Sequence, residues 1–531
     1  MTGPSPGASV DRNPEFLSGD LAAGARLRDL ANQVATAVAG WAGGTGPRSA
    51  ISSGALGGLV AALDPCPDDG IPFDQVLREV GDAVLAHGVR TFDPACAAHL
   101  HSPVLLTAAA AELAIGATNQ SMDSYDQAPA ATLAEDHLVR WLAGLVGLPA
   151  GASGVLTAGG TASNLLGLLL ARAHARSATR AGWRIVASEA AHFSVQQAAA
   201  VLGLGREAVV GVATDDHGRI DVDALDDALA TLDDEGLRPI ALVGTAGTTD
   251  LGAVDPLDAL ADRATDRGAW FHVDAAVGAA FCLSDRLRPS VRGLERADSI
   301  TADLHKLWWQ PIGASALLVR DRGTLAAARQ PSDYLDREED DATGVLNLVS
   351  RSLDTSRRFD ALKVLLSLRS TGRLRLAAHL EHLVATTAAV ARLVDEHADL
   401  ELLAPASTVT VVFRWNPGSA PPDATPRGDT WLHGTPHSAV AEEVSGGGTA
   451  AARALGAVNT GIQRALFDSG RAVIGRTRHR GRVALKLTLV NPQVTVADVD
   501  RVLGLIVAEG GRLGRRPSPA PTARPPLEAP S

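Results

Sequence analysis

Two stretches of this chain decide its fold: Trp270-Phe-His-Val-Asp-Ala-Ala276 and Asp298-Ser-Ile-Thr-Ala-Asp-Leu-His-Lys306. Each is an apolar run of strand length that ends in polar side chains. Ligands of open α/β sheets bind outside the carboxyl ends of the strands, so Asp274 and Lys306 are expected at one sheet edge. In isolation, Asp274 is also typical of a helix cap or a turn, and Lys306 of a surface lysine whose amine reaches solvent.

The surrounding sequence has the same organisation. From about residue 104 to 320, strand-like runs such as WRIVAS and RPIALVGTAG alternate with helix-like runs such as TASNLLGLLLARAHARSA. This alternation indicates an α/β domain with a mostly parallel sheet. After a long helical stretch, the runs STVTVVFRW and VALKLTLVN and two further helices predict a smaller α+β domain.

These patterns predict four parts of the chain. Residues 1–103 are expected to form a flexible leader and a helical arm, residues 104–395 the large domain, and residues 396–510 the small domain. A Pro/Gly-rich insertion near 417–448 interrupts the small domain, and the tail 511–531 is expected to be disordered because it cannot bury a core.

The composition argues against several classes of protein. Among 531 residues, 48 Lys and Arg face 60 Asp and Glu, so the net charge of -12 disfavours nucleic acid or an anionic membrane as the main partner. Three cysteines are too few for a disulfide framework, which favours a reducing, cytoplasmic setting. The start of the chain lacks a signal-peptide pattern, and no apolar stretch reaches the roughly 20 residues of a membrane span.

A third motif, Thr157-Ala-Gly-Gly-Thr-Ala-Ser-Asn164, is a turn of small residues before a helix. Backbone N–H groups at a helix start and the nearby hydroxyls form an anion site that suits a phosphate group. The motif lacks the Gly-Lys-Ser/Thr of a P-loop and the GxGxxG of dinucleotide folds, so neither a nucleoside triphosphate nor NAD is indicated. Taken alone, a helix cap without a ligand is the simpler interpretation.

Together, the three motifs supply what pyridoxal 5'-phosphate requires. The turn would anchor the phosphate, a carboxylate would keep the pyridine nitrogen protonated, and a lysine would form a Schiff base with the aldehyde. The same parts serve decarboxylases, aminotransferases and other lyases, so the residues alone do not separate these reactions.

An ordered series of motifs resembles the group II pyridoxal-phosphate-dependent amino-acid decarboxylases, which include glutamate, aromatic amino acid and diaminobutyrate enzymes. The series runs through TAGGTASN, SEAAHFSVQQAA, GTAGTTDLGAVDP, HVDAA and DSITADLHKLWWQP, and the resemblance covers about residues 90 to 505. NQSMDSYDQAP and HKLWWQP are most similar to the L-2,4-diaminobutyrate branch and to the lysine and ornithine decarboxylases of siderophore pathways. The resemblance implies an aspartate aminotransferase-like large domain of fold type I with a seven-stranded, mostly parallel sheet, and a homodimer with its sites at the subunit interface.

The resemblance also assigns roles to residues. Lys306 would hold the cofactor aldehyde, Asp274 would pair with the pyridine nitrogen, and His192 would stack on the ring. Tyr334 matches a loop tyrosine that protonates the substrate carbon after carbon dioxide leaves. Further cofactor-binding positions would be Thr161, Ala162, Ser163, Thr249, Ala276, Asp303 and His305, and the substrate-side positions would be Ser102, Tyr125 and Lys486.

Some features depart from this pattern or suggest other functions. Most relatives have an aromatic residue and two glycines after HVDAA, whereas this chain has Val277-Gly-Ala-Ala280, which leaves the substrate open among diamino, aromatic and acidic amino acids. Cys96, His99 and His101 are metal-ligand types but lack a closed set of four, so no metal is expected. The arginine-rich run 471–482 is interpreted as a solvated hairpin with ion pairs rather than a nucleic-acid surface.

Overall fold

The computed structural model describes residues 16–175, 182–329, 335, 345–418 and 450–515. The helices are α1 (Leu21–Ala42), α2 (Ser53–Ala61), α3 (Phe73–Ala83), α4 (Leu106–Thr118), α5 (Pro129–Leu145), α6 (Gly160–His174), α7 (Ser194–Val201), α8 (Val222–Asp234), α9 (Leu257–Arg267), α11 (Ala361–Thr371), α12 (Arg373–Glu396), α13 (Ala450–Asp468) and α14 (Val496–Gly514). The strands are β1 (Cys96–Ala97), β2 (Ser153–Thr157), β3 (Trp183–Ser188), β4 (Val209–Val212), β5 (Arg238–Thr245), β6 (Trp270–Asp274), β7 (Ser299–Asp303), β8 (Ser315–Val319), β9 (Leu400–Leu402), β10 (Thr410–Trp415), β11 (Val473–His479) and β12 (Arg482–Thr488).

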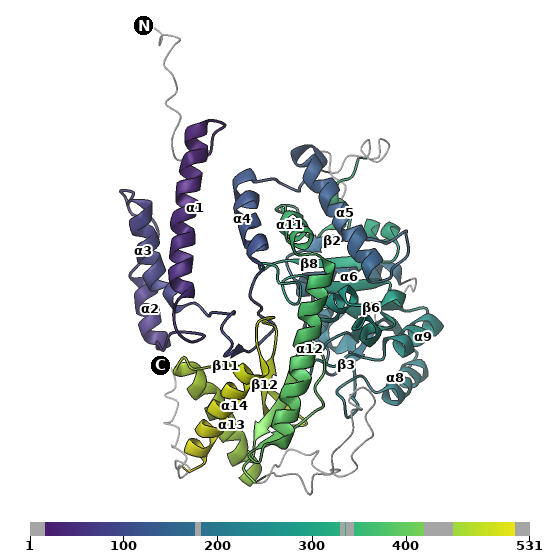
Figure 1. The fold of residues 1–531 in the computed structure, drawn as a ribbon. Coiled ribbons are helices and arrows are strands. Elements are labelled where there is room, and N and C mark those ends of the chain that lie inside the picture. The colour runs from purple at the N-terminus through teal and green to yellow at the C-terminus, as the bar shows by residue number, and fades with distance from the viewer. Residues whose placement is uncertain (1–15, 176–181, 330–334, 336–344, 419–449, 516–531) are drawn as a thin grey trace, which may run out of the picture.

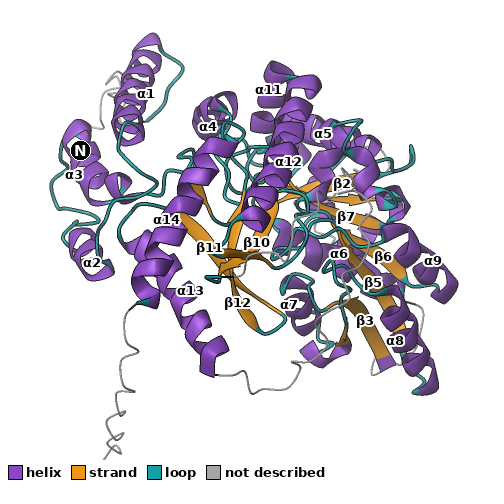
Figure 2. Ribbon diagram, turned by 60° about the horizontal axis from the view of Figure 1, so that its bottom comes forward, coloured by secondary structure: helices purple, strands orange, loops and turns teal. Residues whose placement is uncertain are grey.

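The large sheet has seven strands in the order β2-β8-β7-β6-β5-β3-β4. Neighbouring strands from β7 through β6, β5 and β3 to β4 pair in parallel, and β8 is antiparallel to both of its neighbours. Helices cover both faces of this sheet (Figure 2). The predicted seven-stranded, mostly parallel sheet is therefore confirmed.

The strands at the centre of the large sheet are buried along their whole length. Every residue of β6 and β7 is buried, as expected for a parallel sheet covered on both faces. Successive side chains point to opposite faces, so Trp270 packs in one apolar cluster and Phe271 in the other. Both strands also carry polar side chains within this buried layer, at His272, Ser299 and Thr301, and each ends in an aspartate.

The second sheet has five strands in the order β1-β11-β12-β10-β9. Its strand β1 comes from the segment that was predicted to belong to the N-terminal arm, and it pairs in parallel with β11. The helix α12 ends at Glu396, where the small domain was predicted to begin, and in Figure 1 it extends from the large sheet to the strands of the second sheet. The helix α14 continues to Gly514, so the first residues of the predicted tail are helical.

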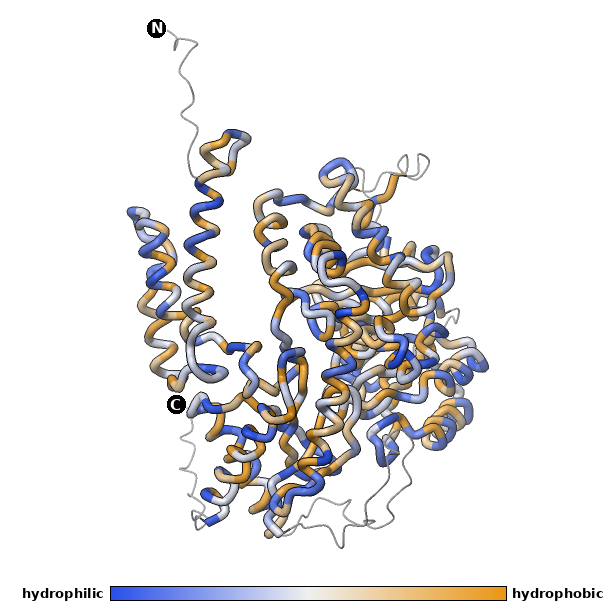
Figure 3. The backbone as a smooth tube through the Cα atoms, viewed as in Figure 1, coloured by the Kyte–Doolittle hydropathy of each residue, from blue (hydrophilic) through white to orange (hydrophobic). Residues whose placement is uncertain are grey.

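The helices α1 to α3 lie apart from the two sheets in Figure 1. No residue of α1 is buried, and Figure 3 shows apolar positions along these helices. Leu21 is 94% exposed, so the arm presents apolar surface that the rest of the chain does not cover. In the described part of the chain, no helix is both long and apolar enough to cross a membrane.

The arginine-rich run forms an antiparallel hairpin of β11 and β12. Arg480 pairs with Asp216, and Arg482 pairs with Glu401 at 3.3 Å. The prediction of a hairpin with arginine ion pairs is therefore confirmed.

Candidate active site

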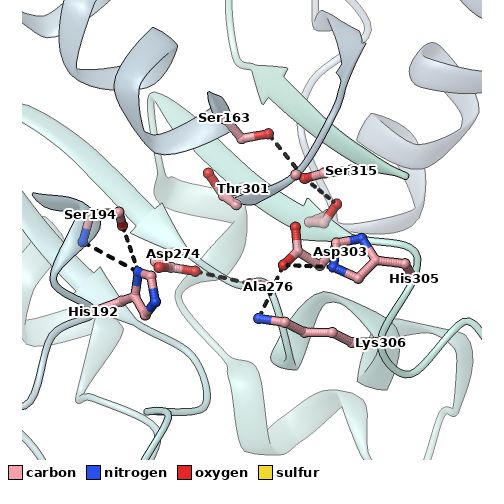
Figure 4. A network of polar contacts seen from close by, with 12 residues as sticks. Ser163, His192, Ser194, Asp274, Ala276, Thr301, Asp303, His305, Lys306 and Ser315 are labelled. Atoms are coloured by element: carbon pink, nitrogen blue, oxygen red, sulfur yellow. Dashed lines mark hydrogen bonds and ion pairs between the residues drawn. The ribbon is translucent and has the colours of Figure 1, made fainter. Parts of the chain in front are cut away.

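The candidate site lies at the carboxyl ends of β6 and β7, which are neighbours in the large sheet (Figure 4). Asp274 is the last residue of β6 and lies opposite Thr301 of β7. Asp303 is the last residue of β7, and Lys306 follows it by three positions. Because the two strands are parallel neighbours, the two predicted motifs come together at one edge of the sheet.

Lys306 and Asp303 form an ion pair. The Nζ atom of Lys306 lies 3.0 Å from Oδ2 of Asp303, and the side chains are 19% and 4% exposed. The Nε2 atom of His305 lies 3.7 Å from the same oxygen. The other carboxylate oxygen, Oδ1 of Asp303, is buried and has no hydrogen-bond partner among the described residues. A buried carboxylate oxygen without a partner indicates that this part of the site accommodates a further donor.

Asp274 is held on both of its oxygen atoms. Its Oδ1 accepts the backbone N–H of Ala276 at 3.1 Å, and its Oδ2 accepts the side-chain amide of Asn164 at 2.8 Å. The residue is only 7% exposed, so its carboxylate has a fixed orientation at the end of β6. Asn164 was not predicted as a site residue, although it is the last residue of the TAGGTASN motif.

His192 is half-buried on the loop that precedes α7. Its Nδ1 atom lies 2.8 Å from the hydroxyl of Ser194 and accepts the backbone N–H of the same residue at 3.3 Å. Burial lowers the pKa of His192 below its ordinary value of 6.5, and the positive charge of Lys306 lowers it further, whereas Asp274 and Asp303 raise it. The ring is therefore neutral at neutral pH, which suits a group that packs on an aromatic ring.

The predicted phosphate turn connects β2 to α6. No side chain caps α6, whose N-cap residue is Gly159. The hydroxyl of Ser163 is buried and lies 2.7 Å from Thr157 Oγ1 and 3.0 Å from Ser315 Oγ, so it supports the turn from behind. A Cβ atom on Gly160 would lie 2.9 Å from both carboxylate oxygens of Asp303, so only glycine brings the helix start this close to the carboxylate.

These features fit the predicted cofactor. Thr161 is exposed and Ala162 is half-buried in the first turn of α6, where uncapped N–H groups favour an anion. Lys306 and Asp274 supply the amine and the carboxylate at the adjacent strand ends. The N–H groups of this turn would hold the phosphate, Asp274 the pyridine nitrogen, and Lys306 the aldehyde.

The predicted substrate-side residues lie in different places. The hydroxyl of Ser102 donates to the backbone carbonyl of His305 at 3.2 Å, beside the site. The ammonium of Lys486 donates to the backbone carbonyl of Thr249 at 2.8 Å, which brings together two residues that were predicted separately.

Two predicted residues are not brought to the site by the described contacts. Tyr125 is half-buried, and its backbone N–H donates to Oδ1 of Asn347. Tyr334 lies outside the described residues. Within the described ranges, no group of three His, Cys, Asp or Glu residues is arranged to hold a metal ion.

Comparisons with known proteins relate this chain to one family. Residues 62–416 match the family model described as the pyridoxal-dependent decarboxylase conserved domain. The L-2,4-diaminobutyrate decarboxylase of Rhizobium meliloti (strain 1021) is 40% identical over 458 residues, which are 86% of this chain and 86% of that protein. The protein of the same name from Acinetobacter baumannii is 35% identical over 483 residues, which are 87% of this chain and 89% of that protein.

A solved structure supports the same relationship. It is the glutamate decarboxylase domain of diaminobutyrate-pyruvate transaminase and L-2,4-diaminobutyrate decarboxylase from Vibrio parahaemolyticus. The two chains superpose with a TM-score of 0.80 at 33% identity, and the match covers 94% of this chain and 98% of that chain. The similarity therefore extends over both sheets rather than over isolated motifs.

Proposed function

The chain belongs to the pyridoxal-dependent decarboxylase family, and from this premise we propose that its substrate is L-2,4-diaminobutyrate. Membership confirms the predicted fold class, the cofactor pyridoxal 5'-phosphate and the action as an amino-acid carboxy-lyase. Removal of the α-carboxyl group of this substrate would yield carbon dioxide and propane-1,3-diamine. The substrate is supported by the two relatives that are 40% and 35% identical to this chain, both of which are named L-2,4-diaminobutyrate decarboxylase.

The substrate rests on the two relatives, and the structural observation that carries the proposed roles of the residues is the convergence of Asp274, Lys306 and the start of α6 at one sheet edge. Pyridoxal phosphate, when bound, provides the electron sink for the electron pair that the departing carboxyl group leaves behind. Asp274 would hold a proton at the pyridine nitrogen, because its carboxylate is buried and fixed by two hydrogen bonds. His192 would cover one face of the ring with its neutral imidazole.

Lys306 has a second role in this proposal, since its ammonium would be returned to Asp303 whenever it is not bound to the aldehyde. The two groups lie 3.0 Å apart in the structure, and this ion pair would keep the amine beside the site during the reaction. Asp303, His305 and Ser163 would support the phosphate side, together with Thr161 and Ala162. Ala276 would lie next to the cofactor ring, because its N–H fixes Asp274.

The substrate would be oriented by polar groups beside the cofactor. Ser102 is buried and bonded to the carbonyl of His305, and Lys486 carries a positive charge suited to a carboxylate. Tyr125 completes the proposed substrate-side set, whereas Thr249 is proposed to contact the cofactor. Tyr334 is proposed to deliver a proton to the substrate carbon, and a Tyr334→Phe variant should bind substrate but release the amine at least about 100-fold more slowly.

We also propose that the protein is a homodimer in the cytoplasm. The exposed apolar residues Leu21, Leu106 and Phe193 support a second subunit as their cover, since they are 94%, 86% and 64% exposed. All three cysteines are free, which fits a reducing compartment. Sedimentation equilibrium should give twice the mass of the chain.

The decisive experiment is carbon dioxide release with amine identification from purified protein and pyridoxal phosphate. The substrates would be 2,4-diaminobutyrate, ornithine, lysine, glutamate, tyrosine and tryptophan. Release from 2,4-diaminobutyrate that is lost in Lys306→Ala supports the proposal. Preference for ornithine or lysine would move the enzyme to the related diamino acid branch, and preference for tyrosine, tryptophan or glutamate would refute a diamino acid substrate.

A further inference from the structure

Asn164 has every hydrogen-bonding position of its side chain occupied. The residue is 1% exposed in the first turns of α6. Its Nδ2 donates to Asp274 Oδ2 at 2.8 Å and to Ser194 Oγ at 2.9 Å. Its Oδ1 accepts Thr301 Oγ1 at 2.6 Å and lies 3.0 Å from His272 Nε2. One carboxamide therefore contacts four side chains from β6, β7 and the first residue of α7.

The orientation of this carboxamide follows from its neighbours. A carboxylate only accepts hydrogen bonds, so the atom of Asn164 that faces Asp274 must be the donor Nδ2. The oxygen Oδ1 then faces His272, so Nε2 of His272 must carry the hydrogen. A reversed amide would place its oxygen against the carboxylate of Asp274, where neither group has a hydrogen to donate.

A chain of hydrogen bonds leads to Asn164 from the side opposite Asp274, through His272. The indole of Trp270 donates to Ser299 Oγ at 2.7 Å, and Ser299 Oγ lies 2.8 Å from His272 Nδ1. Because His272 carries its hydrogen on Nε2, Nδ1 is the acceptor and Ser299 is the donor. The donors therefore run from Trp270 through Ser299, His272 and Asn164 to Asp274. Hydrogen bonds that are aligned in this way strengthen one another in a buried environment.

A second branch leads from Asn164 to His192. Nδ1 of His192 accepts a hydrogen bond from the backbone N–H of Ser194, so this nitrogen carries no hydrogen. The hydroxyl of Ser194 must therefore also donate to Nδ1. The oxygen of that hydroxyl is then free to accept the second N–H of Asn164. Asn164 thus contacts the group proposed for the pyridine nitrogen and, through one hydroxyl, the group proposed for the ring face.

We propose that Asn164 is a positioning residue, whose carboxamide fixes the orientation of Asp274 and, through Ser194, of His192 for cofactor binding. This inference rests on the proposed roles of Asp274 and His192. It assigns a function to a side chain whose hydrogen bonds within the described residues go to Asp274, Ser194, Thr301 and His272 and not to Lys306. Asp274 is the only one of these two groups that Asn164 contacts directly, so most of its contribution should disappear when Asp274 is absent.

A double-mutant cycle tests this transmission by measuring the dissociation constant of pyridoxal phosphate from the apoprotein, without substrate. Asn164→Ala should weaken binding at least about 10-fold in the wild-type background. In an Asp274→Ala background, the same change should weaken binding less than about 2-fold. An equal loss in both backgrounds would show that Asn164 does not act through Asp274, and it would overturn the inference.

Two further variants separate positioning from loss of packing. Asn164→Asp keeps the shape of the side chain but places a carboxylate against Asp274, so cofactor affinity should fall at neutral pH and recover as the pH is lowered and one carboxyl takes up a proton. Asn459 is a matched control, because it is 0% exposed and is hydrogen-bonded to Trp415 in the small sheet. Asn459→Ala should lower the urea stability of the apoprotein and leave cofactor affinity within about 2-fold.

The possible results distinguish a failure of this inference from a failure of the proposed function. If Asn459→Ala weakened cofactor binding as much as Asn164→Ala does, the effect would be due to general destabilisation, and the inference would be overturned. Affinity of Asn164→Asp that does not change with pH would also contradict it. Because no substrate is present, a wrong substrate assignment leaves these results unchanged. A wild-type apoprotein that fails to bind pyridoxal phosphate would overturn both conclusions.

Discussion

Lys486 donates its side-chain ammonium to the backbone carbonyl of Thr249, with 2.8 Å between Nζ and the oxygen. Lys486 belongs to β12 of the small sheet, and Thr249 follows β5 of the large sheet. The ammonium also lies 3.3 Å from Oδ1 of Asp250, and the Lys486 side chain is only 8% exposed. This contact joins the two sheets through a charged group. A substrate carboxylate that reaches Lys486 would therefore bind an ammonium that also donates a hydrogen bond to the carbonyl of Thr249.

Replacement of Lys486 by Met should separate these two roles. If its charge binds the substrate carboxylate, KM should rise about 10- to 100-fold, because a charge-assisted hydrogen bond contributes about 1.5–3 kcal/mol. Asp250→Asn is the control, since its side chain is 57% exposed and an exposed ion pair contributes at most about 1 kcal/mol. Steady-state kinetics and cofactor titration of both variants would check this, and similar KM values would contradict the substrate role.

Covalent binding of the cofactor should occur at one lysine. The chain contains three lysines, Lys306, Lys363 and Lys486. Lys363 is 0% exposed and paired with carboxylates, and Lys486 is bonded to Thr249. Borohydride reduction of the protein with pyridoxal phosphate, followed by peptide mass spectrometry, should therefore place the added mass on Lys306 alone. Lys306→Arg keeps a cation beside Asp303 and should show no addition and an activity loss of at least about 1000-fold; label on another lysine would refute the assignment.

The stability of the protein should fall in acid partly through His272. Burial lowers the pKa of this fully buried ring below its ordinary value of 6.5, against the opposing charge of Asp274. Below pH 6.5 the unfolded chain therefore binds more protons than the folded protein. The contribution of His272 to stability is present above pH 6.5 and is lost as the pH falls toward its lowered pKa.

Urea unfolding at several pH values checks this prediction. His272→Gln removes the titrating ring, so the difference in unfolding free energy between wild type and variant should shrink as the pH falls below 6.5. Asp255 acts in the opposite direction, because burial raises its pKa to about 6 and its contribution is lost as the pH rises through that value. A difference between wild type and His272→Gln that stays constant with pH would contradict the role of His272.

A buried lysine should also contribute strongly to stability. Nζ of Lys363 lies 2.9 Å from a carboxylate oxygen of Glu112 and 2.9 Å from one of Asp360, joining α4 to α11. Lys363→Met would leave two carboxylates without this cation, and we expect a loss of about 2–4 kcal/mol in the free energy of unfolding. Arg358 pairs with the same carboxylates but its side chain is 51% exposed, so Arg358→Met should cost less than about 1 kcal/mol. Equal losses from the two variants would argue against a buried pair.

The sequence by itself determined the class of fold and the chemical groups of the site. Buried strands read as mainly apolar runs, so the ends of β6 and β7 were visible at Asp274 and Asp303, and Lys306 follows three positions after the second end. Because these two strands are neighbours in the sheet as well as in the sequence, their order along the chain was enough to predict a common edge. The three motifs together indicated the cofactor, and the family resemblance then identified the reaction.

Only the tertiary structure decided which distant side chains meet. Asn164 and Asp274 are 110 positions apart, and Lys486 and Thr249 are 237 apart, yet both pairs lie within hydrogen-bonding distance. Their contact depends on the placement of β2 three positions from β6 in the sheet and on the docking of β12 against the large domain. Hydrogen bonds form only within about 3 Å and along defined directions, and neither condition is encoded in residue types or spacing. Residue patterns therefore specified the parts of the site, and the packing of the two sheets specified their partners.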